Sequence, residues 1–207
     1  MAMALSGLFL MIFLLQHFAI NITSVFSAAV FNEVSHFMGT NPLVQFVLQP
    51  ILIGGVIFHF LMGFVLEWQN KKARGIKYAV FKGSANSSWM SRNMLISGAT
   101  ILAFLGLHFY DFWVPEIKHK YIEFLPEDPN RYHEELVHKF EDLGRVIIYV
   151  ISFFFLSLHL LHGFASSFQS VGFNNKYTPL LKFIGKLYAI LIPAGFAFIA
   201  IVHYLNN

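Results

Sequence analysis

Four histidines lie inside four separate apolar stretches of this chain, and each stretch is long enough to cross a bilayer. They are His17, His59, His108 and His159. A run of about 20 apolar residues spans the hydrocarbon core as an α-helix. An imidazole in hydrocarbon needs a partner that offsets its burial, and it marks a functional site by default. The sequence therefore predicts a membrane protein whose chemistry lies within the bilayer.

The composition agrees with a membrane protein. Of the 207 residues, 57% are hydrophobic and only 12% are charged, whereas a soluble domain carries about 25% charged residues. The chain has no cysteine, which excludes disulfides, thiolate catalysis and iron–sulfur ligation by this chain. In a membrane protein the Lys and Arg residues report orientation, so the net charge of +3 does not indicate a nucleic-acid partner.

Five apolar spans separated by polar segments predict an all-α integral membrane bundle of five transmembrane helices. We expect one membrane domain over residues 1–207, in contact with the lipid bilayer. No Lys or Arg precedes the first span, so we interpret it as an uncleaved helix rather than a secretory signal. The expected spans are roughly residues 4–31, 44–68, 92–114, 143–168 and 180–205.

Basic residues are concentrated in the second and fourth connections. The third connection also holds basic residues, but they are mixed with most of the acids. The positive-inside rule puts connections two and four in the cytoplasm, so we expect a cytoplasmic N-terminus and a periplasmic C-terminus. The basic residues are Lys71, Lys72, Arg74, Lys77, Lys82 and Arg92 in the second connection, and Lys176, Lys182 and Lys186 in the fourth.

The depth of each histidine predicts how the four pair. His59 and His159 precede the basic ends of their spans, which puts them in the cytoplasmic half or near the middle. His108 lies 16 residues after Arg92, about 24 Å along a helix, and His17 is near the middle of a span that runs outward. The economical pairing is His59 with His159 and His17 with His108. Two bis-histidine sites in a helix bundle favour haem iron as the ligand.

Glycines support a flat ligand near these histidines. Gly63 and Gly163 each follow a histidine by four residues, and therefore lie one turn away on the same helical face. Without a side chain there, a macrocycle can approach the backbone closely. Gly98 lies ten residues before His108, roughly on the same face, and is expected to serve the same purpose.

Two other interpretations of the histidines stay open. Each imidazole could bond a carbonyl or hydroxyl of a neighbouring helix and have no further role. Alternatively, the four could form a proton relay in a haem-free transporter or channel. A colourless purified protein would favour the relay, and absorption bands of b-type haem would favour the haem protein.

The runs around the histidines resemble the di-haem cytochrome b membrane-anchor subunit of succinate dehydrogenases and fumarate reductases. The resemblance is to the five-helix, single-polypeptide type, in particular its Bacteroidetes-like branch, and covers nearly the whole chain. It is carried by Leu-Gln-His-Phe at 15–18 with Asn21, by the segment 92–98 leading to His-Phe-Tyr-Asp-Phe-Trp at 108–113, and by 159–169.

The resemblance implies a multi-pass subunit of the bacterial inner membrane. Its partners would be a flavoprotein with FAD, where succinate or fumarate reacts, and an iron–sulfur subunit. The chain would anchor both and pass electrons between the iron–sulfur clusters and menaquinone through two b haems. His59 and His159 would bind the haem nearer the clusters (the proximal haem), and His17 and His108 the distal haem.

Residues near the ends of the spans are candidates for the haem propionates, because an Arg fork pairs with a carboxylate. Equally, Arg and Trp are ordinary anchors at the membrane interface. His162, three residues after His159, is expected to bond a propionate or a carbonyl, although it too could reach iron. The propionate candidates are Arg92, Trp89 and Ser91 for the proximal haem and Arg145 for the distal haem.

Oxidation of a quinol requires a proton acceptor. The resemblance puts the quinol site near the distal haem, with a carboxylate from the first connection, where Glu33 is the only acid and His36 lies three residues on. Asp111, one turn past His108, is a competing acid. Some fumarate reductases of this type carry a glutamate at the position of Ser157, so a proton path there is not supported. We expect the other histidines to be solvated or interfacial: His119, His133, His138 and His203.

Overall fold

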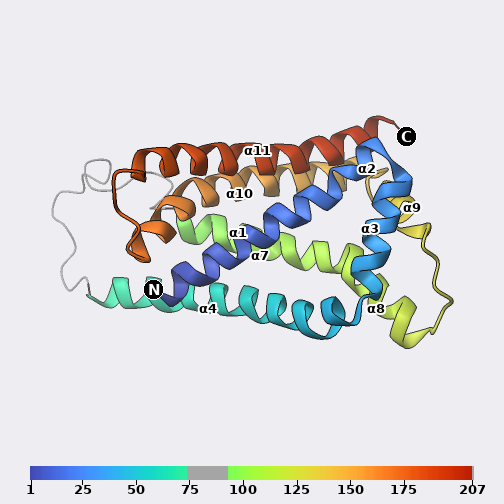
Figure 1. The fold of residues 1–207 in the computed structure, drawn as a ribbon, viewed down its shortest axis with the longest axis horizontal. Helices are drawn as coiled ribbons and strands as arrows, with labels where there is room; N and C mark the ends of the chain where they lie inside the picture. The colour runs from blue at the N-terminus through green and yellow to red at the C-terminus, as the bar shows by residue number, and fades with distance from the viewer. Residues whose placement is uncertain (74–92, 207) are drawn as a thin grey trace.

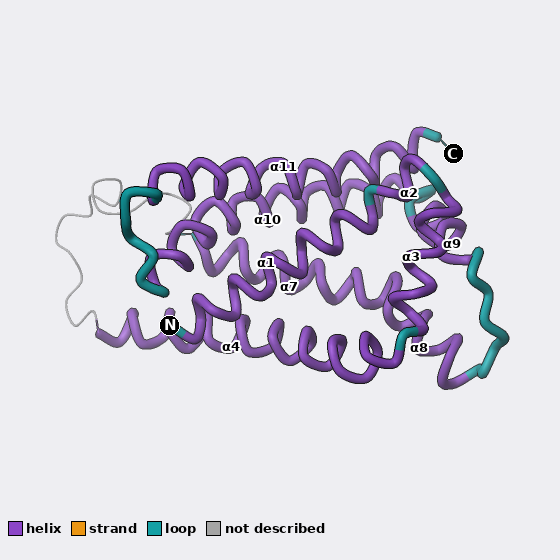
Figure 2. The backbone as a smooth tube through the Cα atoms, viewed as in Figure 1, coloured by secondary structure: helices purple, strands orange, loops and turns teal. Residues whose placement is uncertain are grey.

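The structure is a computed structural model that describes residues 1–73 and 93–206. All regular structure in these residues is helical, which confirms the predicted all-α class. The long helices form one elongated bundle, with the N-terminus at one end and the C-terminus at the other (Figures 1 and 2). Five helical stretches in this part of the chain are long and apolar enough to cross a membrane: Ala2–Phe26, Val44–Ala73, Met94–Ile122, Leu143–Ser170 and Thr178–Leu205.

The first span ends earlier than its hydropathy predicts. It consists of α1 (Ala2–Asn21) and α2 (Thr23–Phe26), and a separate helix α3 (Ala28–Thr40) follows. Ser27 adopts extended backbone angles, and its hydroxyl accepts a hydrogen bond from the Val30 amide at 3.3 Å. Such a residue caps a new helix. The chain therefore turns at Ser27, and α3 crosses the end of the bundle near the C-terminus (Figure 1).

The third span continues further than expected. It begins with α7 (Met94–His108) and η2 (Phe109–Trp113), a π-helical turn. It then passes through Pro115 in α8 (Val114–Ile117) and ends with a second π-helical turn, η3 (Lys118–Ile122). Pro115 lies at the start of α8, close after η2, and the first turn of a helix tolerates proline because its N–H would have no helical partner there. The span continues through Pro115 to Ile122.

The packed core lies mainly between the last two spans. A short helix α9 (Arg131–Lys139) precedes α10 (Leu143–Ser170), and α11 (Thr178–Leu205) follows it. The side chains buried in this core include Tyr149 of α10 and Ala200 of α11. The first span packs closely against α11 at Gly195, where an added Cβ would lie 2.3 Å from the ring of Phe18. This contact sets the position of the residue next to Phe18, which is His17.

The second span packs least tightly. It is formed by η1 (Val44–Leu48), another π-helical turn, and α4 (Gln49–Ala73), and neither has a buried residue. A partly open apolar hollow of about 370 Å³ lies between α4 and the third span. Isoleucines, valine and leucines line it, together with Phe109 and Gly106, which lies two residues before His108. The bundle therefore leaves apolar space beside the helices that carry His59 and His108.

Candidate functional site

The structure brings His17 of α1 and His108 of α7 together. Their ring centroids are 5.8 Å apart, and the rings are nearly perpendicular at 87°. Aromatic side chains hold both rings in place: Phe13 stacks on His17 at 5.4 Å, and Phe104 stacks on His108 at 5.8 Å. Phe196 of α11 lies 5.7 Å from the His17 ring. We call this the distal pair.

His59 of α4 and His159 of α10 form a second pair. Their ring centroids are 6.3 Å apart, with an angle of 66° between the rings. Ser6 of α1 contacts His59, and Ser6 precedes His17 on the same helix by 11 residues, about 16 Å along the axis. The second pair therefore lies closer to the end of the bundle that carries the N-terminus. We call it the proximal pair.

The spacing within each pair would allow both imidazoles to bind the same metal ion. A ring nitrogen lies about 2.0 Å from such an ion, so the two ring centroids would be about 6 Å apart. Among the described residues, no group of three or more His, Cys, Asp or Glu side chains could hold a bare ion. A site with two histidines can hold an ion whose other ligands come from a macrocycle, as in haem.

The ring nitrogens have different partners in the two pairs. In the proximal pair, His59 Nδ1 lies 2.9 Å from Ser6 Oγ, and His159 Nδ1 lies 3.2 Å from Ser97 Oγ. In the distal pair, His108 Nδ1 is buried and has no hydrogen-bond partner among the described residues. The His17 ring faces the Asn21 amide at 3.4 and 3.5 Å. Within the described residues, both proximal rings therefore have a serine hydroxyl at Nδ1, and neither distal ring does.

The glycines singled out from the sequence lie beside the proximal site. A Cβ at Gly98 would lie 3.7 Å from His159 Cε1, so Gly98 packs against the proximal pair and not below His108. A Cβ at Gly63 would lie 3.8 Å from Met3 Cε, and one at Gly163 would lie 3.7 Å from Met94 Cε. Methionine tips are flexible and fill irregular gaps, so they can move aside for a flat ligand.

Arg145 and Asp111 face each other across α10 and the third span. Arg145 Nε lies 3.1 Å from Asp111 Oδ2, and the Tyr149 hydroxyl donates to the same oxygen at 2.8 Å. The Asp111 side chain has no exposed surface. Arg145, a candidate for a haem propionate, is therefore paired with the carboxylate of Asp111, a candidate proton acceptor. The other propionate candidates, Trp89, Ser91 and Arg92, lie outside the described residues, and His162 lies half-buried on α10.

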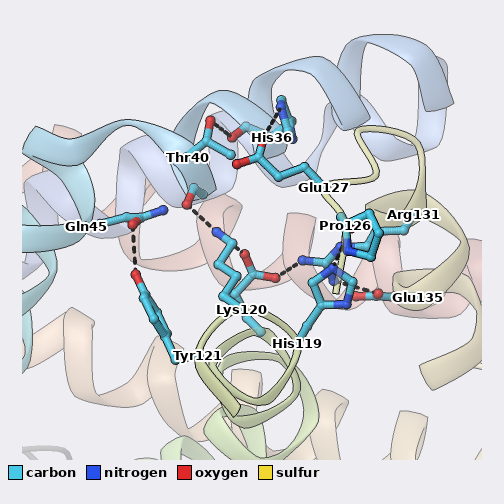
Figure 3. Close-up of polar contacts among 12 residues, drawn as sticks. His36, Thr40, Gln45, His119, Lys120, Tyr121, Pro126, Glu127, Arg131 and Glu135 are labelled. Carbon is cyan, nitrogen blue, oxygen red and sulfur yellow. Dashed lines mark hydrogen bonds and ion pairs between the residues drawn. The ribbon is translucent and has the colours of Figure 1, made fainter. Parts of the chain in front are cut away.

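A network of charged side chains joins α3, α9 and the end of the third span. Glu116 accepts hydrogen bonds from Lys120 and Arg131, and Lys120 also donates to the Gly39 carbonyl. Arg131 pairs with Glu135 at 2.7 Å (Figure 3). Burial would lower the pKa of Arg131, but its bonds to the two glutamates raise it. We call these contacts the cap network, because they hold α3 and α9 over the end of the bundle.

The two quinol-site candidates of the first connection lie on α3, beside the cap network. The Glu33 side chain is exposed. His36 is half-buried, and its Nε2 lies 3.9 Å from Glu127 Oε2 (Figure 3). His36 Nδ1 is buried and has no partner among the described residues. A cavity of about 20 Å³ beside it is large enough for one water molecule and is also lined by Thr40 and Tyr132.

Two histidines that we expected to be solvated or interfacial are packed together instead. His133 of α9 and His203 of α11 have ring centroids 5.5 Å apart. His203 Nε2 lies 2.9 Å from Ser24 Oγ, and His133 Nε2 lies 3.1 Å from the Ser24 carbonyl oxygen. His203 is buried and follows buried Phe196 by seven residues, so helical periodicity could have revealed it. The contact made by His133 depends on how α9 packs against the bundle, and no pattern in the sequence near His133 predicts that packing.

Replacing Glu116 with glutamine is expected to loosen α9. The change removes the charge that Lys120 and Arg131 share, at a side chain that is 21% exposed, and costs about 1–2 kcal/mol locally. Backbone amides of α9 should then exchange with deuterium roughly tenfold faster. Glu123→Gln is the matched control, since its pair with Lys118 is exposed. Equal exchange in both variants would contradict a structural role for the cap network.

Comparisons with known proteins do not assign the chain to a family. No family model, no curated protein and no solved structure matches it.

Proposed function

We propose that this chain is the membrane-anchor and electron-transfer subunit of a succinate:quinone oxidoreductase or quinol:fumarate reductase. In this proposal it holds two b haems and passes electrons between the iron–sulfur clusters of a partner subunit and menaquinone. A flavoprotein partner carries FAD and the dicarboxylate site. The chain spans the bacterial inner membrane with its N-terminus in the cytoplasm.

One observation carries the proposal: two pairs of histidine rings lie at different depths of one apolar bundle. The ring centroids are 5.8 Å apart in the distal pair and 6.3 Å apart in the proximal pair. Each pair has a spacing that would let both rings bind one ion, and each joins two helices that are not adjacent in sequence. Four unrelated structural histidines would not require this repeated spacing.

The chain's own residues would bind and orient the cofactors. His59 with His159 would hold one haem iron and His17 with His108 the other, and aromatic rings restrain the distal pair. When bound, each haem supplies a one-electron Fe(III)/Fe(II) couple. Since the chain has no cysteine, the iron–sulfur clusters must belong to a partner. The loose packing of α4, none of whose residues is buried, is compatible with a bulky ligand beside this helix.

Purification from membranes tests the proposal. The expected product is red, contains two b haems per chain by pyridine haemochrome analysis, and co-purifies with a flavoprotein and an iron–sulfur protein. A colourless protein without partners would contradict the proposal and favour a haem-free transporter or proton channel. Haem without those partners would indicate a cytochrome b that serves another dehydrogenase.

Glu33→Gln is expected to lower quinone-linked turnover by a factor of about 100 or more, because a positioned base contributes that much to proton transfer. Haem content and dye-linked succinate oxidation should not change, since neither uses this carboxylate. Glu134→Gln, at another exposed glutamate, is the matched control. Turnover within about twofold of wild type, below ~0.5 kcal/mol in barrier, would make His36 the better proton acceptor, because Asp111 is paired with Arg145.

A further inference from the structure

Two serines contact the proximal pair in the same way from neighbouring helices. Ser6 of α1 lies 2.9 Å from His59 Nδ1 on α4, and Ser97 of α7 lies 3.2 Å from His159 Nδ1 on α10. Ser97 is buried. Each contact joins two helices, so it fixes the direction in which an imidazole points as well as the helix that carries it.

The backbone determines which group donates in these hydrogen bonds. A serine hydroxyl has one proton to donate. Ser6 Oγ lies 2.8 Å from the Met3 carbonyl oxygen, and Ser97 Oγ lies 3.0 Å from the Met94 carbonyl oxygen. A carbonyl can only accept, so each hydroxyl donates to its own helix and accepts from the histidine. Nδ1 of each ring therefore carries the proton, and Nε2 keeps its lone pair.

We propose that Ser6 and Ser97 are positioning residues that hold His59 and His159 in the tautomer with a free Nε2, ready to bind iron. This inference rests on the proposed function, because the ligand of Nε2 is the proximal haem. A hydrogen bond from Nδ1 makes an imidazole more basic and a stronger ligand of ferric iron. The two serines thus tighten proximal haem binding and lower the reduction potential of that haem.

The distal pair lacks this arrangement. His108 Nδ1 has no hydrogen-bond partner among the described residues. The group that faces the His17 ring is the amide nitrogen of Asn21, which is a donor and cannot accept a proton from the ring. Removal of the serines should therefore change one haem and leave the other as it was.

The test compares Ser6→Ala, Ser97→Ala and the double variant with wild type in the full complex. The proximal haem should dissociate about 10–100 times more readily in competition with a haem-binding protein. Its potential should rise by about 30–60 mV, which corresponds to a roughly threefold to tenfold change in the ratio of ferric to ferrous affinity. Electron paramagnetic resonance should show the change in one of two haem signals.

Two controls separate positioning from packing. Ser152→Ala removes another buried serine, whose hydroxyl bonds only the Ile148 carbonyl at 2.7 Å among the contacts described here; it should alter neither haem. Ser6→Thr and Ser97→Thr retain a hydroxyl and should restore the wild-type potential. If both haems are present but the alanine variants behave like Ser152→Ala, the inference is wrong while the proposed function stands. A wild-type complex without haem would overturn both.

Discussion

Replacement of His59 with alanine is expected to remove one of the two haems and leave the other in place. In the proposed site, iron is held by one ring from α4 and one from α10, whose centroids are 6.3 Å apart. Without His59 the haem would lose one of its two protein ligands, and α4 contains no other histidine to replace it. The haem content measured by pyridine haemochrome analysis should fall from two haems per chain to one. His159→Ala should give the same result.

His162→Ala is the matched control, because it removes a histidine of α10 that is three residues away from the proposed ligand. Both haems should remain, since Ser97 contacts the ring of His159. If His162→Ala loses a haem while His159→Ala keeps both, the ligand assignment on this helix is reversed. A wild-type content of one haem would contradict the pairing itself.

The sequence predicted which segments are helices better than where they end. An apolar run of about 20 residues has few alternatives to a helix in a bilayer, and residues 1–73 and 93–206 contain five such helices. The ends depend on single backbone conformations that hydropathy does not report. Ser27 is extended and ends the first span at Phe26, whereas the third span passes through Pro115 after a π turn.

Depth along a helix could be estimated from residue numbers, because each residue rises 1.5 Å. That estimate related His59 to His159 and His17 to His108, and the structure places these rings side by side. Rotation about the helix axis could not be estimated, since it is set by packing between helices. For this reason the sequence did not reveal the contact between Ser6 and His59, or that Gly98 lies beside His159.

The pairing of Asp111 with Arg145 also depends on rotation, and it changes what these two residues are expected to do. Each was a candidate for cofactor chemistry when considered separately. In the structure, the carboxylate has two partners on α10, Arg145 and Tyr149. A buried carboxylate that is already paired is a weaker candidate for a proton acceptor than an exposed one such as Glu33.

Arg145→Met is expected to destabilise the protein strongly. The Asp111 side chain has no exposed surface, and Arg145 Nε lies 3.1 Å from it. Removing one partner of a buried ion pair leaves an uncompensated charge, which costs about 3–5 kcal/mol. Tyr149 would still donate one hydrogen bond, so we expect the lower end of this range. For a chain of this size, 3 kcal/mol lowers Tm by about 6–12 °C, measurable by thermal unfolding in detergent.

Two further variants show whether the loss comes from the unpaired carboxylate. Lys118→Met is the control, because its ion pair with Glu123 is exposed and such pairs contribute about 0–1 kcal/mol. Combining Arg145→Met with Asp111→Leu removes both charges, and Tm should recover in part because no carboxylate stays buried alone. If Arg145→Met lowers Tm no more than Lys118→Met does, the Asp111–Arg145 contact does not stabilise the bundle, and Arg145 is free to bind a propionate of the distal haem.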